Sequence, residues 1–234
     1  MDFILEGLRE AFWLLMHLDA ETISAIKTTI ESSSLSIFFS LFIGLPLGFI
    51  LGFFDFPGRK ALRLLFDTLL AIPTVVVGLI VYAFISNRGP LGSYELLYTM
   101  KGIVIGQTLL ALPIIISLTA NAIEGMDKKL SLTLASFGLT FSQTIKNVIW
   151  ELRHTLIAVA ITAYGRVVAE VGIAMMIGGN IKWFTRTITT AISLETSKGE
   201  FAMGIALGFV LMLIAFIANI SLYYLRKKAL GKMR

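Results

Sequence analysis

The sequence predicts an all-α integral membrane protein, and its composition and apolar runs carry that prediction. Of the 234 residues, 56% are hydrophobic and only 15% are charged, whereas an ordinary soluble domain has about 25% charged residues. A bilayer core about 30 Å thick requires roughly 20 mostly apolar helical residues to cross it. Five apolar runs meet this length, at residues 30–54, 61–86, 102–123, 154–179 and 201–225. We therefore expect five transmembrane helices within a membrane domain at residues 21–226.

Residues 1–20 form a separate N-terminal segment in this prediction. Apolar side chains recur at helical spacing between Phe3 and Leu18, but Glu6, Arg9 and Glu10 interrupt them. This pattern is typical of an amphipathic helix that lies in the membrane interface. A sixth membrane span is the alternative.

The distribution of Lys and Arg predicts the orientation. Cytoplasmic loops carry an excess of these residues. When the connections are assigned alternately to the two sides, the side with the loop at 124–153 and the basic tail at 227–234 holds more of them. We expect this loop and the C-terminus in the cytoplasm and the N-terminus outside. The net charge of +5 follows this topology, so it does not indicate nucleic-acid binding.

The sequence lacks the residue patterns on which most enzymes depend. It contains no Cys, and its two His, His17 and His154, lie far apart, so no metal-ligand spacing is present. Asp67 and Glu170 are the candidate carboxylate pair within the apolar runs, and neither belongs to a recognisable catalytic motif. The phosphate loop G-x-x-x-x-G-K-[ST] is also missing. We expect no metal, no cofactor and no catalysis on this chain. An intramembrane enzyme and a membrane scaffold without transport are the alternatives.

Glycine and proline mark special positions in the first three runs. Gly44, Gly48 and Gly52 recur every four residues, a pattern that lets helix backbones approach closely in a membrane. The second and third runs repeat a similar hexapeptide, which ends at Pro73 in one and at Pro113 in the other. A proline inside a helix removes a hydrogen bond and kinks the axis. We expect helix packing at the glycines and bends at the prolines.

The fourth run carries small residues and two charges. Thr162, Gly165, Ala169 and Gly172 recur in steps of three and four, so a continuous helix places them on one face. This face is expected to line a translocation path or to pack against another helix or a second copy.

Arg166 and Glu170 stand four residues apart in the same run, within reach of each other on a helix. Charges at this depth are costly, about 2.5 to 3.5 kcal/mol on insertion scales. We expect a mutually dependent pair in which a charge-swapped double variant recovers part of the loss. A direct contact with a transported substrate is the alternative.

The polar loop at 124–153 resembles the cytoplasmic coupling loop of ABC-importer permeases. That family's pattern is E-A-A-x-x-x-G, then nine residues, then I-x-L-P. With Gly138 at the glycine position, Leu132, Thr133 and Leu134 stand at E-A-A, so most of the pattern has diverged. Gly138 offers a turn between two helix-compatible stretches. The coupling residues that we expect are Thr133, Leu134, Ala135, Ser136, Phe137 and Gly138.

The last third of the chain strengthens the resemblance. The run Gly165-Arg-Val-Val-Ala-Glu-Val-Gly172, continuing through Gly178-Gly-Asn-Ile181 to Thr185-Arg-Thr-Ile-Thr-Thr-Ala191, is similar to molybdate and tungstate permeases. The following Leu194-Glu-Thr-Ser-Lys-Gly199 and the diverged coupling loop are most similar to the tungstate branch. The resemblance extends over about residues 20–226.

This resemblance implies an ABC type I importer permease in a prokaryotic inner membrane. It implies a homodimer with one pore, two ATPase subunits docked on residues 128–147, and an extracellular oxyanion-binding protein. ATP would be bound by the partner ATPase. The cargo is expected to be tungstate, with molybdate or another solute as the alternative. Residues of the outer mouth that we expect to guide the oxyanion are Lys182, Thr185, Arg186 and Thr189.

Overall fold

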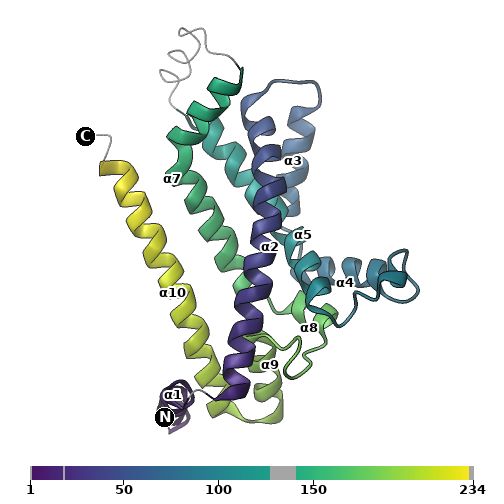
Figure 1. Ribbon diagram of the computed structural model, residues 1–234, viewed down its shortest axis with the longest axis vertical. Coiled ribbons are helices and arrows are strands. Elements are labelled where there is room, and N and C mark those ends of the chain that lie inside the picture. The colour runs from purple at the N-terminus through teal and green to yellow at the C-terminus, as the bar shows by residue number, and fades with distance from the viewer. Residues whose placement is uncertain (1, 18, 127–140, 232–234) are drawn as a thin grey trace.

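The computed structural model describes residues 2–17, 19–126 and 141–231, and within these ranges the chain is helical without strands (Figure 1). The long helices run roughly side by side, and shorter ones lie at the lower end and on one flank. The elements are α1 Asp2–Met16, α2 Ala20–Phe53, α3 Arg59–Leu69, α4 Thr74–Ile85, the 3₁₀ turn η1 Gly92–Tyr94, α5 Met100–Glu124, α7 Phe141–Val168, α8 Gly172–Gly178, α9 Ile188–Lys198 and α10 Phe201–Gly231. The all-α prediction is confirmed.

A stripe of small residues joins α2 to α5. A Cβ atom added at Gly48 would lie 2.6 Å from Cβ of Thr119 and 2.8 Å from the carbonyl oxygen of Ile116. One added at Gly52 would lie 2.9 Å from the carbonyl oxygen of Ala120. The two backbones therefore approach closely because these positions lack side chains. The packing expected from the glycines is confirmed.

The same stripe continues toward the start of α2 as buried serines, which the sequence reasoning missed. Ser32, Ser36 and Ser40 are each fully buried. The Ser36 hydroxyl donates to Oε1 of Gln107 at 3.0 Å, and the Ser40 hydroxyl donates to the carbonyl oxygen of Thr108 at 3.2 Å. The four-residue spacing of Ser32, Ser36, Ser40 and Gly44 was the available signal, because serine, like glycine, is small enough for a close helix interface.

The second apolar run is not one continuous span, contrary to the sequence prediction. It divides into α3 and α4, whose axes differ by 102° across residues 70–73. Pro73 stands immediately before α4 with φ −58°. Proline has no N–H to donate and disfavours helical geometry in the residue before it, so the helix ends ahead of it. Pro113 lies inside the uninterrupted α5, so the repeated hexapeptide produces a break in one place and not in the other.

The fourth run is also broken. α7 ends at Val168, and α8 starts at Gly172 with its axis turned by 59°. By length and composition, α2 and α5 can each cross a membrane within the described residues, and the two bent pairs raise that number to four. The fifth run lies in α10, which extends without a break from Phe201 to Gly231.

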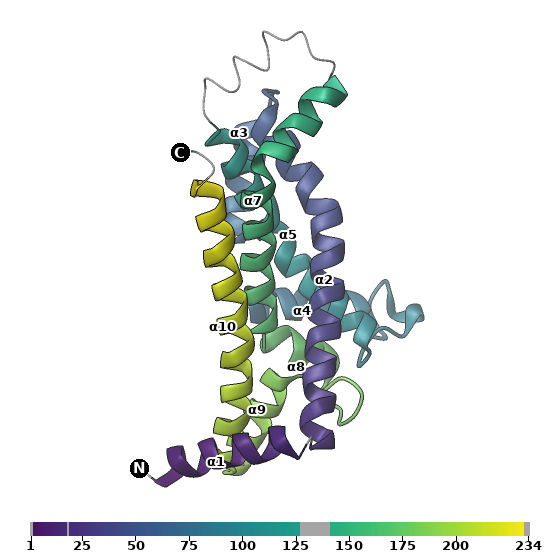
Figure 2. The ribbon, with the colours of Figure 1, turned by 60° about the vertical axis from the view of Figure 1, so that its left-hand side comes forward.

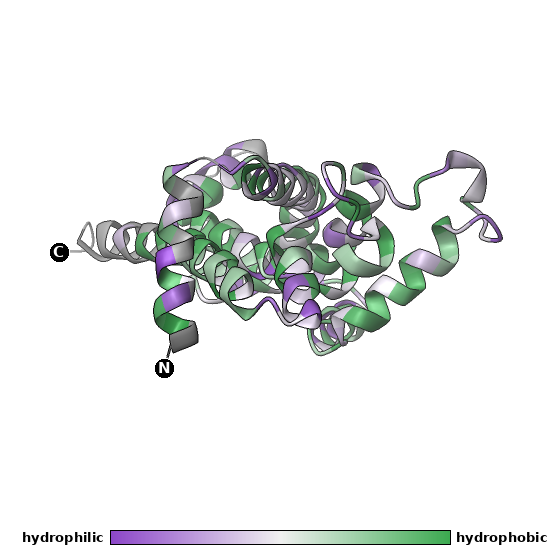
Figure 3. Cartoon of the chain, turned by 90° about the horizontal axis from the view of Figure 1, so that it is seen from below, coloured by the Kyte–Doolittle hydropathy of each residue, from purple (hydrophilic) through white to green (hydrophobic). Residues whose placement is uncertain are grey.

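The two ends of the bundle differ. The end of α5 at Glu124, the start of α7 at Phe141 and the end of α10 all point toward the upper end (Figures 1 and 2). α1 and α9 lie at the lower end, and α1 runs across the bundle there (Figures 2 and 3). Large apolar side chains of α1 stay exposed, among them Leu5, Phe12 and Met16. An exposed apolar face on a helix across the bundle end suits an interfacial helix.

Candidate functional site: the open face of α7 and the outer loop

Part of α7 faces no other element within the described part of the chain. Thr162 is exposed, and a Cβ atom added at Gly165 would meet nothing within 4 Å. Next to this face, a hollow of about 470 Å³ opens between α5 and α7. Its polar lining includes Asn121, Thr155 and Thr162. A face of small and polar groups left uncovered in one chain suits the contact with a second copy or the wall of a path.

The break at 169–171 divides the small-residue face that the sequence predicted. Thr162 and Gly165 share the open face of α7, but Ala169 lies in the break and Gly172 starts α8. A Cβ atom added at Gly172 would lie 3.1 Å from Cγ2 of Val75, so Gly172 allows α8 to pack against α4. The prediction of one continuous face was wrong because it assumed an unbroken helix.

Arg166 and Glu170 lie within ion-pair distance across this break. Nη1 of Arg166 is 3.8 Å from Oε2 of Glu170. The Glu170 side chain is 2% exposed and that of Arg166 is 50% exposed. Oε1 of Glu170 also accepts a hydrogen bond of 3.1 Å from the backbone N–H of Ile173. The buried carboxylate thus caps the start of α8 and holds the bend, while the guanidinium stays half exposed.

The loop between α8 and α9 brings two cations together on one carboxylate. Lys182 Nζ lies 2.5 Å from Oε2 of Glu21, and Arg186 donates to Oε1 of the same residue. Nε of Arg186 also donates to Oδ1 of Asn180 at 3.1 Å, which fixes the guanidinium. These groups border a hollow of about 300 Å³ that Glu195 and Lys198 also line. Sequence reasoning missed Glu21, which lies 165 residues from Arg186 in the chain.

The two threonines expected at the outer mouth are interior instead. Thr185 is fully buried, and its hydroxyl donates to the carbonyl oxygen of Gly178 at 2.5 Å. Thr189 is 4% exposed, and its hydroxyl donates to the carbonyl oxygen of Glu170 at 2.8 Å. Both hydroxyls hold the loop and α9 against the α7–α8 bend. They do not face a passing solute in this structure.

A second charge cluster lies at the opposite end of the bundle. Arg59 lies 2.7 Å from Oε1 of Glu124 and pairs with Asp55, and Arg63 lies 3.6 Å from Oε2 of Glu124. Arg63 also donates to the side chain of Asn121 beside the hollow. This cluster fastens α3 to the ends of α2 and α5. The coupling residues Thr133 to Gly138 lie outside the described residues, so their arrangement stays a prediction.

The similarity of this chain to known proteins identifies its family. A family model, described as the binding-protein-dependent transport system inner membrane component, matches residues 44–231. The chain belongs to this family. The match includes α7, α8 and the loop with Lys182 and Arg186, whereas α1 and Glu21 precede it. As a member of this family the chain is a transport subunit and not an enzyme, as the sequence predicted.

Curated relatives extend over nearly the whole chain. The tungstate uptake system permease protein TupB of Campylobacter jejuni is 56% identical over 97% of this chain and 95% of its own length. TupB of Peptoclostridium acidaminophilum is 35% identical over 97% of this chain and 100% of its own length. The molybdenum transport system permease protein ModB of Azotobacter vinelandii is 26% identical over 92% of this chain and 99% of its own length.

Solved structures share the fold. The inward-facing MetNI methionine ABC transporter matches with a TM-score of 0.72 and 16% identity, over 91% of this chain and 97% of the matched chain. A bacterial alginate ABC transporter, in complex with an alginate pentasaccharide-bound periplasmic protein, matches with a TM-score of 0.74 and 18% identity, over 95% and 86%. The prediction of an ABC type I importer permease fold is confirmed.

Proposed function

We propose that this chain is the permease through which an ATP-driven importer carries tungstate. The observation that carries the proposal is the 56% identity to a tungstate permease over 97% of the chain. A tetrahedral oxyanion also suits the chemistry of the polar groups, since Lys182 and Arg186 offer two positive charges at one end of the molecule.

The charges of the loop between α8 and α9 suit the passage of an oxyanion better than its tight binding. A conducting pathway requires sites that attract the ion and still release it. Glu21 pairs with both Lys182 and Arg186, so its negative charge weakens the positive field of these two side chains. The Glu21 side chain is 37% exposed, so it remains in contact with solvent. An oxyanion would meet a moderated positive region there and would not be trapped.

The partners follow from the same proposal. A second copy would cover the open face of α7 around Thr162 and Gly165, and the path would run along that shared face. Two ATPase subunits would dock at residues 128–147, and an extracellular oxyanion-binding protein would deliver the cargo to the other end. ATP would bind only to the ATPase subunits, whose closure would move the docking segment and alternate access to the path. The permease would lie in a prokaryotic inner membrane with its C-terminus in the cytoplasm and its N-terminus outside.

Molybdate is the second candidate cargo, because a molybdenum permease aligns with 92% of the chain. Its 26% identity is less than half of that to the tungstate permease, which favours tungstate.

Transport by the complete importer tests the proposal. The permease, its ATPase and its binding protein are reconstituted in vesicles, and ATP-driven uptake of labelled tungstate, molybdate and sulfate is compared. We expect tungstate to be carried in preference to sulfate. ATP-driven uptake of an amino acid or a cation, with none of the oxyanions carried, would refute the proposal. A molybdate rate above that of tungstate at equal concentration would favour the second candidate.

A further inference from the structure

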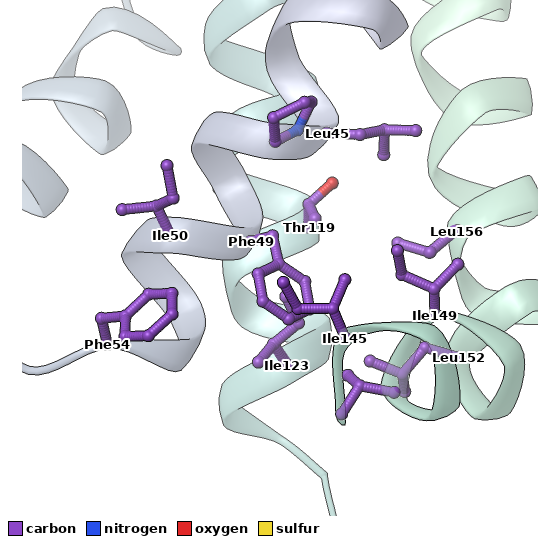
Figure 4. A pocket seen from close by; sticks show the side chains of 12 residues that line it. Leu45, Phe49, Ile50, Phe54, Thr119, Ile123, Ile145, Ile149, Leu152 and Leu156 are labelled. Carbon is purple, nitrogen blue, oxygen red and sulfur yellow. The ribbon is translucent and has the colours of Figure 1, made fainter. Parts of the chain in front are cut away.

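An apolar cavity lies between the upper ends of three helices, away from the open face of α7. It has a volume of about 420 Å³. Figure 4 shows its walls, with Phe49 and Ile50 from α2, Ile123 from α5, and Ile145 and Ile149 from α7. Among the described residues that line it, Thr119 alone has a polar side chain. A cavity of this character stays dry, because water finds too few polar partners in it.

The cavity continues into a surface of α2 that no other described element covers. Ile43, Leu47 and Ile50 are each at least 40% exposed, and Ile50 also lines the cavity. In a membrane protein, such uncovered apolar side chains face lipid. The cavity is thus an inward extension of the lipid-facing surface.

The depth of the cavity matches one leaflet. Its lining extends from Leu45 in α2 to Phe54, the residue after the end of α2, directly before Asp55 and the charge cluster with Arg59. At 1.5 Å per residue this length is about 14 Å, close to half of a hydrocarbon core of about 30 Å. The cavity therefore reaches from the expected cytoplasmic interface to about the middle of the bilayer.

The neighbouring face of α7 has the residues of a membrane interface. Lys146, Trp150 and Arg153 recur in steps of four and three, so they share one face. Trp150 is 69% exposed, and the Arg153 guanidinium lies over its ring at 4.6 Å from the centroid. Trp, Lys and Arg concentrate where headgroups meet the apolar core, and cationic side chains there attract anionic lipid.

The three faces of α7 follow one another around the helix. Ile145, Ile149 and Leu152 line the cavity, and the face of Lys146 and Trp150 lies next to them. The open face with Thr162 and Gly165 lies roughly a third of a turn away on the other side of the cavity-lining residues. A second copy on the open face would leave the cavity open to lipid.

We infer that this cavity binds one acyl chain of a phospholipid of the cytoplasmic leaflet, with the headgroup phosphate near Lys146 and Arg153. A flexible apolar chain fills an irregular dry cavity and restores the dispersion contacts that an empty one lacks. The site holds α2 and α7 at their expected cytoplasmic ends, on either side of the segment expected to dock the ATPase. It does not depend on which oxyanion is carried.

Photo-crosslinking in the assembled importer tests the inference. The complex is placed in nanodiscs that contain phosphatidylglycerol with a photoreactive diazirine on one acyl chain, and modified residues are identified by peptide mass spectrometry. We expect labelling at residues 45–54 and 145–156 to saturate as the probe is titrated against unlabelled lipid. Labelling at Phe42, which is 75% exposed, should rise in proportion to the probe.

Matched variants separate the cavity from the general lipid surface. Leu156→Trp fills the cavity and should abolish its labelling, whereas Leu47→Trp on the exposed face of α2 should not. Ile145→Phe fills the same space if Leu156→Trp does not assemble. Lys146→Gln with Arg153→Gln should remove the preference for phosphatidylglycerol over phosphatidylcholine but retain acyl labelling. Lys27→Gln at the other end of α2 is the control for charge.

Two outcomes overturn the inference. One is cavity labelling that stays proportional to the probe and ignores the filling variants. The other is covalent dimerisation of Ile149→Cys by a short bismaleimide, which would assign the cavity to a second copy. The chain contains no Cys, so this cross-link reports on the introduced thiol of the permease.

Discussion

Glu170 lies 3.8 Å from Nη1 of Arg166 and is almost fully buried, whereas half of the Arg166 side chain is exposed. The two partners therefore do not contribute equally. The Glu170 carboxylate has a second task, since it accepts the N–H of Ile173 at the start of α8. The bend between α7 and α8 therefore depends more on the Glu170 carboxylate than on the half-exposed Arg166 guanidinium.

Glu170→Ala should destabilise the permease more than Arg166→Ala. The first leaves the buried N–H of Ile173 without its acceptor, at a cost of about 1 to 3 kcal/mol. The second removes a half-exposed partner. Thermal melting in detergent measures both. We expect the charge-swapped double variant to recover nothing, in contrast to the sequence expectation, because a guanidinium at position 170 cannot accept a hydrogen bond. Recovery in the swap would show that charge pairing alone matters.

Gly48→Ala should weaken the interface between α2 and α5. Its Cβ atom would lie 2.8 Å from a backbone oxygen, and overpacking of this kind costs about 1 to 3 kcal/mol. Gly208→Ala in α10 is the matched control, because its Cβ atom would meet nothing within 4 Å. Melting temperatures compare the two. Equal losses would contradict close packing at Gly48.

Gly165→Leu tests the open face of α7. The side chain has room in a single chain, since nothing lies within 4 Å of the Cβ position. We expect normal insertion and thermal stability of the monomer, but reduced dimerisation or uptake, because the leucine enters the shared face. Size-exclusion chromatography and vesicle uptake measure these effects. Wild-type uptake in an intact dimer would remove Gly165 from the path and from the interface.

Glu21→Gln should lower stability only modestly, because the glutamine oxygen can still accept a hydrogen bond from the mostly buried Arg186, while the pair with the half-exposed Lys182 is lost. It should raise the initial rate of oxyanion uptake at low salt, because Lys182 and Arg186 then present unopposed charges. This gain should disappear at high ionic strength. Glu195→Gln, in the same hollow but paired with Lys198 at 2.9 Å, is the control. Identical salt profiles for the two variants would contradict the role of Glu21.

Gly138→Val addresses the expected coupling segment. The variant should insert and bind its ATPase but hydrolyse ATP without matching transport, because β-branched valine is unsuited to the turn expected at this position. ATPase activity and uptake are measured on the same vesicles. An unchanged ratio of substrate carried to ATP hydrolysed would argue against a coupling turn at Gly138.

The sequence by itself determined the class of protein and the local pairings. Long apolar runs have few alternatives to helices, since backbone groups in lipid must be satisfied within the segment. The four-residue spacing of Gly44 and Gly48 and of Arg166 and Glu170 determined which residues share a face or lie within reach. Resemblance in the last third of the chain led to the permease family.

Only the tertiary structure decided which helices break and which distant groups meet. Pro73 ends a helix and Pro113 does not, although similar residues precede them, because the outcome depends on whether neighbouring helices support the freed backbone groups. Thr185 and Thr189 turned inward to bind backbone carbonyls, and Glu21 met Lys182 and Arg186 across the fold. Local spacing carries no information about contacts between remote segments, since these arise from packing the whole bundle.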